Sequence, residues 1–225
     1  MLSNILWRLL DAEDIFGDGS SPSAVSSKNR IEIKGGHELE NKERYLTLCR
    51  SVKREGIEDL LQWLETSDFY TAPASTRFHG NYPGGLLEHS LNVYDELVRL
   101  LEAYPEVVVP QESVVVASLF HDLCKVNFYA PEKRNRKNEF GKWESYDAYT
   151  VKENFCYGGH GSKSVFLVQY FMRLTPEEAV AIHCHMGAFS ENPQDVYRAY
   201  EQCPFAFLLH MADSAATIIK ETKEA

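Results

Sequence analysis

The stretch Val114-Val-Val-Ala-Ser-Leu-Phe-His-Asp-Leu-Cys-Lys125 is the most apolar part of the chain, and it contains the adjacent polar residues His121 and Asp122. The pattern predicts a buried helix over residues 112–124. An ionised carboxylate in an apolar helix is costly unless a partner compensates its charge. The neighbouring imidazole indicates that this partner is a metal cation, because both side chains are common metal ligands.

Helical patterns also dominate the chain from residue 42 onward. Residues 86–103 carry apolar side chains at spacings of three and four residues, and His89 falls in one of these stripes. We therefore expect His89 to face the protein interior. Further helices are expected over residues 42–54, 56–66, 161–173, 176–186 and 204–221.

One region, residues 126–151, has the composition of β-strands. Asn138-Glu-Phe-Gly141 supplies a turn between aromatic and β-branched residues, which predicts a β-hairpin. The predicted fold class is therefore all-α, a helical bundle with one inserted β-hairpin and an N-terminal extension. Residues 1–41 are expected to hold a short amphipathic helix (1–12) and a Gly/Ser-rich linker or flexible arm (17–36), and residues 42–225 the main domain.

Composition excludes some functions. The chain has 225 residues and a formal net charge of −10, so a general nucleic-acid-coating role is not expected. Five cysteines without Cys-x-x-Cys spacing favour reduced thiols and a cytoplasmic location. The apolar N-terminus is interrupted by Arg8, which argues against a signal peptide, and no apolar run approaches membrane-spanning length.

The helix expected after Pro204 is apolar almost all round, and Asp213 is its only acidic residue before Glu221. A buried aspartate needs a partner, and a metal is one such partner. Together with His89, His121 and Asp122 it would give two imidazoles and two carboxylates. That ligand set suits a divalent Mn, Fe, Co, Ni or Zn ion.

Five motifs, in this order, resemble the HD-domain metal-dependent phosphohydrolase superfamily over roughly residues 70–220. The motifs are Gly84-Gly-Leu-Leu-Glu-His89, Leu119-Phe-His-Asp-Leu-Cys-Lys125, Gly158-Gly-His-Gly-Ser-Lys-Ser164, Ala181-Ile-His-Cys-His-Met-Gly187 and Leu209-His-Met-Ala-Asp213. The first of them also looks like the HD domains of some bacterial 3′-to-5′ exoribonucleases. The resemblance implies an HD-type domain over residues 42–225.

The resemblance also implies a ligand set. One metal would be held by His89, His121, Asp122 and Asp213. Family members with two further histidines hold a second metal, and His160 and His185 fill those positions in this chain. Two divalent transition metals are therefore expected.

The implied activity is hydrolysis of a phosphate ester by metal-activated water. The substrate would be a phosphorylated small molecule or nucleotide, or a short nucleic acid. Asp122 would bridge the two metals, and Lys125 would meet a phosphate oxygen and so take part in catalysis. The family's one-metal nucleotidases tend to have Glu at the position of Lys125, so this lysine favours a two-metal site.

Other basic side chains are candidates for substrate binding. Arg77 and His79 lie in the long loop before the first ligand, and Lys163 follows His160. A solvated loop and a surface lysine are the alternative interpretations. A basic cluster in the hairpin could guide a polyphosphate or a nucleic-acid strand, or could be a solvated tip; it comprises Lys133, Arg134, Arg136 and Lys137.

Several histidines keep more than one interpretation. His160 could cap a helix instead of binding a metal. His183 and His185 are two residues apart and face nearly opposite sides of a helix, so one is expected to be a ligand, and the His-Met-Gly context favours His185. His210 could orient a ligand or belong to the core.

Three alternatives to a hydrolase remain at this level. The same ligands would serve a two-iron oxygenase of the HD fold. The chain could be a non-catalytic nucleotide-binding module in which the metal is a scaffold. The polar residues could also form a buried hydrogen-bonded network without any metal.

Overall fold

The computed structural model describes residues 27–152, 158–190 and 192–221, and side chains from residue 39 onward. The chain divides into two units, Met1–Gly35 and Gly36–Ala225, and the account below concerns the second. The helix expected over residues 1–12 lies outside the described residues. The domain boundary at residues 41 and 42 stays a prediction.

The first described helix, α2 (Ser27–Ser51), begins well before residue 42. Residues 27–36 are therefore helical where a linker was expected, and residues 17–26 lie outside the described part of the chain. The expectation rested on Gly35 and Gly36, since glycine in a helix interior costs about 1 kcal/mol relative to alanine. Lys, Arg, Glu and Ile residues on both sides are compatible with a helix and outweigh that cost.

The fold is mostly helical with one hairpin, as predicted. The helices that follow α2 are α3 (Ile57–Glu65), α4 (Gly85–Ala103), α5 (Gln111–Phe120), α6 (Gly159–Phe171), α7 (Pro176–Cys184), α8 (Pro193–Gln202) and α9 (Pro204–Ala215). The strands are β1 (Tyr129–Lys137) and β2 (Trp143–Val151). Helix α8 was not predicted, because Val196 is its one buried residue and leaves no apolar stripe to recognise.

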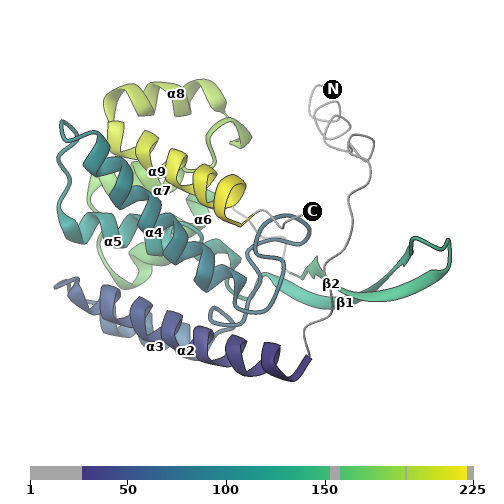
Figure 1. Ribbon diagram of the computed structural model, residues 1–225. Helices are drawn as coiled ribbons and strands as arrows, with labels where there is room; N and C mark the ends of the chain where they lie inside the picture. The colour runs from purple at the N-terminus through teal and green to yellow at the C-terminus, as the bar shows by residue number, and fades with distance from the viewer. Residues whose placement is uncertain (1–26, 153–157, 191, 222–225) are drawn as a thin grey trace. The chain divides into compact units, whose positions relative to one another are not determined.

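The core is built where α4 packs against α5 and α9, and α7 against α5 and α9 (Figure 1). Large side chains from these four helices are fully buried there, including Leu97, Phe120, Ile182 and Leu209. Each such side chain contributes about 1.5–3 kcal/mol through burial. The four helices therefore meet with little freedom to shift, and polar groups at their ends are held in place.

Helix α5 ends at Phe120, so His121 and Asp122 follow the helix instead of lying inside it. A short 3-10 turn, Leu123–Lys125, comes next. Helix α7 likewise ends at Cys184, one residue before His185. The predicted helices 112–124 and 176–186 were thus too long. The change of backbone direction lets adjacent side chains of the His121–Asp122 pair point into one space.

The hairpin is antiparallel, and Arg134 lies opposite Tyr146 across its two strands. Its turn is closed by backbone hydrogen bonds from Asn138 to Lys142 and from Gly141 to Asn138. Burial alternates along β1, and the half-buried face carries Glu132 and Arg134. The hairpin predicted over residues 126–151 is therefore present, with one face turned toward the protein.

A buried ion pair supports the start of α7. The Arg54 guanidinium donates two hydrogen bonds, of 2.7 and 2.6 Å, to the Glu178 carboxylate, which is fully buried. Glu178 also accepts from the backbone N–H of Thr175 in a capping box. None of the helices in the described ranges combines the length and the apolar character needed to cross a bilayer.

Candidate metal centre

Five ligand-type side chains from four helices converge on one space. His89 comes from the first turns of α4, His121 and Asp122 follow α5, His185 follows α7, and Asp213 lies on α9. Four of them are at most 3% exposed, and the side chain of Asp213 is 18% exposed. Residues up to 124 positions apart in sequence are therefore brought together by the packing of α4, α5, α7 and α9.

The distances among these side chains are short. The Nε2 atoms of His89 and His121 lie 3.2 Å apart, and His89 Nε2 lies 3.3 Å from Asp213 Oδ1. Asp122 Oδ2 lies 3.5 Å from His89 Nε2 and 3.4 Å from His121 Nε2. The other oxygen, Oδ1, lies 3.6 Å from His185 Nε2. The two oxygens of Asp122 thus face different histidines.

The second nitrogen of each histidine has a partner that sets the ring's tautomer. His121 Nδ1 donates to Ser118 O at 2.7 Å, and His185 Nδ1 donates to Ile182 O at 2.6 Å. His89 Nδ1 donates to the Glu221 carboxylate at 3.0 and 3.2 Å. In the neutral rings, Nε2 then carries the lone pair, and three such lone pairs point into the same space.

This arrangement fits a divalent cation. Two facing imidazole nitrogens repel each other unless a proton or a cation lies between them. His185 Nε2 is buried, and among the described residues it has no hydrogen-bond partner. The ligand atoms form two groups, each within 4.8 Å: His89, His121 and Asp213, and His121, Asp122 and His185. Imidazole and carboxylate are suited to transition metals, as the sequence predicted.

The electrostatics of the centre follow from burial and the carboxylates. Burial alone would lower the pKa of His89, but hydrogen bonds to Asp122, Asp213 and Glu221 outweigh it and raise the pKa. The pKa of His185 is likewise raised, because its contact with Asp122 outweighs burial. Burial would raise the pKa of Asp122, but the charge of Lys125 and the neighbouring histidines hold it well below its usual range. The carboxylates therefore remain ionised and attract positive charge.

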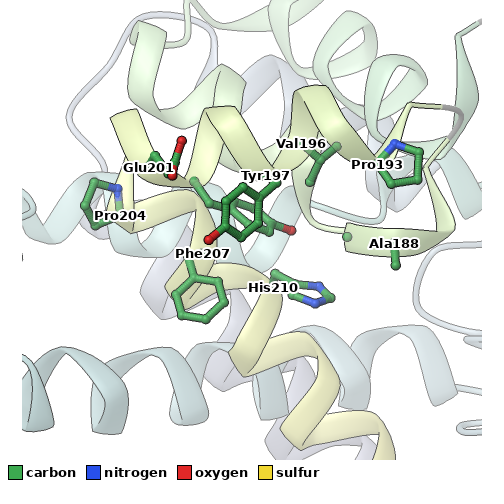
Figure 2. A pocket seen from close by; sticks show the side chains of 10 residues that line it. Ala188, Pro193, Val196, Tyr197, Glu201, Pro204, Phe207 and His210 are labelled. Carbon is green, nitrogen blue, oxygen red and sulfur yellow. The ribbon is translucent and has the colours of Figure 1, made fainter.

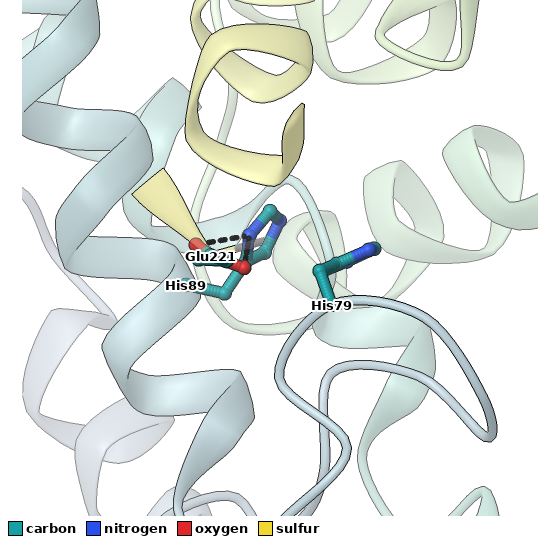
Figure 3. A group of neighbouring side chains, drawn as sticks. All are labelled: His79, His89 and Glu221. Atoms are coloured by element: carbon teal, nitrogen blue, oxygen red, sulfur yellow. Dashed lines mark hydrogen bonds and ion pairs between the residues drawn. The ribbon is translucent and has the colours of Figure 1, made fainter. Parts of the chain in front are cut away.

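Glu221, which the sequence did not single out, binds His89 from the C-terminal side (Figure 3). Asn92 Nδ2 donates to Glu221 Oε1 at 2.9 Å and fixes the carboxylate. Glu221 follows Asp213 by eight residues, a spacing that places both on one helix face, and that spacing was the available signal. A carboxylate that binds the outer nitrogen of a ligand histidine orients the ring and raises its basicity.

His79 reaches the same histidine from the loop before α4 (Figure 3). Its ring centroid lies 4.8 Å from that of His89. Burial and the charge of Lys125 lower the pKa of His79 to about 4, so the ring is neutral near pH 7. His79 therefore lies at the edge of the candidate centre.

Lys125 lies against the candidate ligand Asp122. Its Nζ is 2.6 Å from Asp122 Oδ2, and its side chain is 12% exposed. Burial would lower the pKa of Lys125, but the Asp122 carboxylate raises it, so the ammonium stays charged. Lys125 therefore lies at the candidate centre, where its ammonium binds the Asp122 carboxylate.

Other predicted site residues do not join the two ligand groups. His160 is half-buried, and its Nδ1 contacts Cys124 Sγ at 3.3 Å. Lys163 Nζ lies 5.0 Å from the centroid of the Phe128 ring. His183 is exposed, and its Nδ1 is paired with a serine hydroxyl on α6 at 3.1 Å. Arg77 lines a separate cavity beside the hairpin.

The turn that carries His185 is held from behind. His210 Nδ1 donates to His185 O at 2.7 Å, and Tyr200 OH donates to Cys184 O at 2.7 Å. Gly187 has a φ of 56°, and a Cβ there would lie 2.3 Å from the His210 ring. The rings of Tyr200 and His210 also line a cavity of about 460 Å³ between α8 and α9 (Figure 2). His210 thus acts on the backbone of His185.

The chain is similar to the dihydroneopterin 2′,3′-cyclic phosphate phosphodiesterase of Methanocaldococcus jannaschii, with 25% identity over 154 residues. The match covers 67% of this chain and 53% of that protein, so the chain spans about half the length of the curated relative. No family model matches the chain, and no solved structure matches it. The comparison therefore relates the chain, distantly, to an enzyme of phosphodiester hydrolysis.

Proposed function

We propose that this chain is a metal-dependent phosphohydrolase of the HD type that cleaves a phosphodiester in a nucleotide-like molecule or a short nucleic acid. The observation that carries the proposal is the convergence of three imidazole Nε2 atoms and two carboxylates, with the outer nitrogen of every histidine already bonded. Without a cation, the described residues would leave the buried His185 Nε2 with no hydrogen bond, because Asp122 Oδ1 lies 3.6 Å away.

Each residue has a proposed role. His89, His121, Asp122 and Asp213 would hold one divalent cation, and the second oxygen of Asp122 with His185 would hold another. His160 is the further ligand that we propose for the second cation; it lies near the charges of Asp122 and His185, and its contact with Cys124 uses Nδ1 and leaves Nε2 for coordination. Bound cations of this kind lower the pKa of water and neutralise phosphate oxygens.

Lys125 supplies a further positive charge. Its ammonium binds Asp122 at 2.6 Å and stays protonated beside the ligand carboxylates. From this position it would orient Asp122 and meet a non-bridging oxygen of the phosphate. This charge favours an anionic substrate and supports hydrolysis of a phosphate ester over oxygenation of a neutral molecule.

The class of substrate is suggested by the relative, whose name specifies a 2′,3′-cyclic phosphate. The first assay panel should therefore contain nucleoside 2′,3′-cyclic phosphates, bis-p-nitrophenyl phosphate and short oligonucleotides. Protein purified with its metal content quantified should hydrolyse at least one of them. If no member of the panel is cleaved by metal-replete protein, the proposal fails.

Asp122→Asn is the decisive variant, and Asp195→Asn is its control. Asp122 contacts two candidate histidines, so its loss should lower both bound metal and turnover by at least about 100-fold. Asp195 lies on the surface of α8, 61% exposed, and the same chemical change there should have no effect. Full activity in Asp122→Asn, with circular dichroism matching the wild type, would contradict the assignment. Oxygen consumption without phosphate-ester cleavage would favour an oxygenase instead.

A further inference from the structure

A polar cavity of about 510 Å³ lies between the loop before α4 and the half-buried face of the hairpin. We name it the arginine cleft, after the polar residues that line it: Thr76, Arg77, Asn81, Arg134, Asn135 and Tyr146. Among the described residues, its lining holds two arginines and no carboxylate. The whole chain has 33 acidic and 23 basic residues, so two guanidinium groups in one cleft are a local concentration of positive charge, although Glu132 pairs with one of them, Arg134.

The loop wall of the cleft begins beside the candidate metal centre. Ser75 Oγ donates to His79 O at 2.7 Å and accepts from the Phe78 backbone N–H at 2.9 Å, which closes a tight turn. This turn leaves Arg77 exposed at its tip and places the half-buried His79 ring against His89. Two residues span at most about 7 Å, so the backbone that carries Arg77 lies close to the backbone that carries His79.

Arg77 is available for an anionic ligand. Within the described part of the chain, no carboxylate lies within ion-pair distance of its guanidinium, whereas Arg44, Arg54 and Arg136 each have an acidic partner. A guanidinium presents several donors in one plane and can bind two phosphate oxygens at once.

The hairpin wall holds its arginine in place. Arg134 Nε binds Glu132, and Arg134 Nη2 donates to Tyr149 O at 3.3 Å. These contacts orient the guanidinium and leave further N–H groups for a ligand, because arginine carries five donors. Arg134 therefore needs little reorganisation to bind an anion.

We propose that the arginine cleft binds a second phosphate group of the same substrate whose phosphodiester lies at the metal centre. This inference rests on the proposed function and names its substrate class, a nucleotide that carries phosphate at both ends of its sugar. Arg77 and Arg134 would bind the phosphate, and the amides of Asn81 and Asn135 would supply additional hydrogen bonds.

The test compares two ligands that differ by one phosphate. Binding of adenosine 3′-phosphate and adenosine 3′,5′-bisphosphate is measured by calorimetry with Mn²⁺-loaded protein. The 5′-phosphate should tighten binding by about 10- to 100-fold, the range expected for charge-assisted hydrogen bonds. Arg77→Gln and Arg134→Gln should each remove most of this advantage and leave the affinity for the monophosphate nearly unchanged.

Lys133→Gln is the matched control. Lys133 lies on the same hairpin, 70% exposed, and pairs with Asp147 outside the cleft, so its removal changes the net charge equally. The control should keep the advantage of the bisphosphate to within about twofold, as expected for an exposed ion pair. The proposal would be overturned if all three variants lost the same share of the bisphosphate's advantage in affinity. It would also be overturned if the wild type bound the two ligands equally well, or bound neither.

Turnover measured in parallel separates this inference from the proposed function. Hydrolysis of a 2′,3′-cyclic nucleotide without a preference for the second phosphate would contradict the cleft assignment alone. An arginine-dependent preference without cleavage of any phosphodiester would support the cleft and contradict the hydrolase.

Discussion

Replacement of Glu221 should weaken the metal centre, although Glu221 is not one of its proposed ligands. Its side chain is 3% exposed and accepts the Nδ1–H of His89 at 3.0 and 3.2 Å. Asn92 donates to the same carboxylate at 2.9 Å. The negative charge on one side of the ring makes the opposite atom, His89 Nε2, a stronger ligand.

Two substitutions give a graded effect. Glu221→Gln keeps an oxygen acceptor of the same shape but loses the charge, and a neutral hydrogen bond is about half as strong as a charged one. A difference of about 1 kcal/mol corresponds to roughly a fivefold weaker metal affinity. Glu221→Ala removes the acceptor of the buried His89 Nδ1–H and of the half-buried Asn92 amide, and such losses typically cost about 10- to 100-fold in metal affinity.

The assay is competition for Zn²⁺ between the protein and a chromophoric chelator. Lys220→Ala is the control. Lys220 precedes Glu221 directly, and its replacement removes an ion pair with Glu96 but no contact with His89. The reasoning is refuted if Glu221→Ala binds Zn²⁺ as tightly as the wild type. It is also refuted if Lys220→Ala weakens binding as much, since the turn and not the charge would then be responsible.

Two further predictions concern stability. Arg54→Met should destabilise the protein by about 3–5 kcal/mol in urea unfolding, because it leaves the fully buried Glu178 carboxylate without its bidentate partner. Burial would raise the pKa of Glu178, but hydrogen bonds led by Arg54 lower it. The stability that the pair contributes is therefore complete above the ordinary glutamate pKa and is lost as the pH falls through the lowered pKa. A stability difference between wild type and Arg54→Met that does not shrink in acid would contradict this prediction. Gly187→Ala and Gly141→Ala both place alanine at positive φ, 56° and 73°, at a cost of about 1–2 kcal/mol. Gly187→Ala should lower the free energy of unfolding clearly more than Gly141→Ala and also weaken metal binding, because its Cβ would lie 2.3 Å from the His210 ring whereas Gly141 has open space. Equal unfolding free energies of the two variants would argue against this.

Local patterns predicted the described helices other than α8, but not where they end. The apolar run before His121 continues through Leu123 and Cys124 without Gly or Pro, so nothing in it marks the end of α5 at Phe120. The 3-10 turn that follows α5 places the Lys125 ammonium against Asp122, a contact that the sequence alone did not predict.

Contacts between distant segments were the least predictable. Arg54 and Glu178 are 124 residues apart, and Glu221 meets His89 across 132 residues. Neither pair has a local pattern, because each depends on how whole helices pack. The candidate ligands were easier to recognise, since an ionisable residue in an apolar run is unusual on its own.

The buried Asp122–Lys125 pair has a consequence for the charge balance of the centre. The centre holds three carboxylates, Asp122, Asp213 and Glu221, and among the described residues one ammonium, that of Lys125. Two surplus negative charges therefore remain when the histidines are neutral. Protons on His89 and His185, whose pKa values are raised, can neutralise this surplus, and so can one divalent cation. Metal uptake is therefore an exchange of protons for a dication, and metal affinity must rise with pH. A second dication would reverse the sign of the surplus, and the centre would then be electrically complete only with an anionic substrate in place.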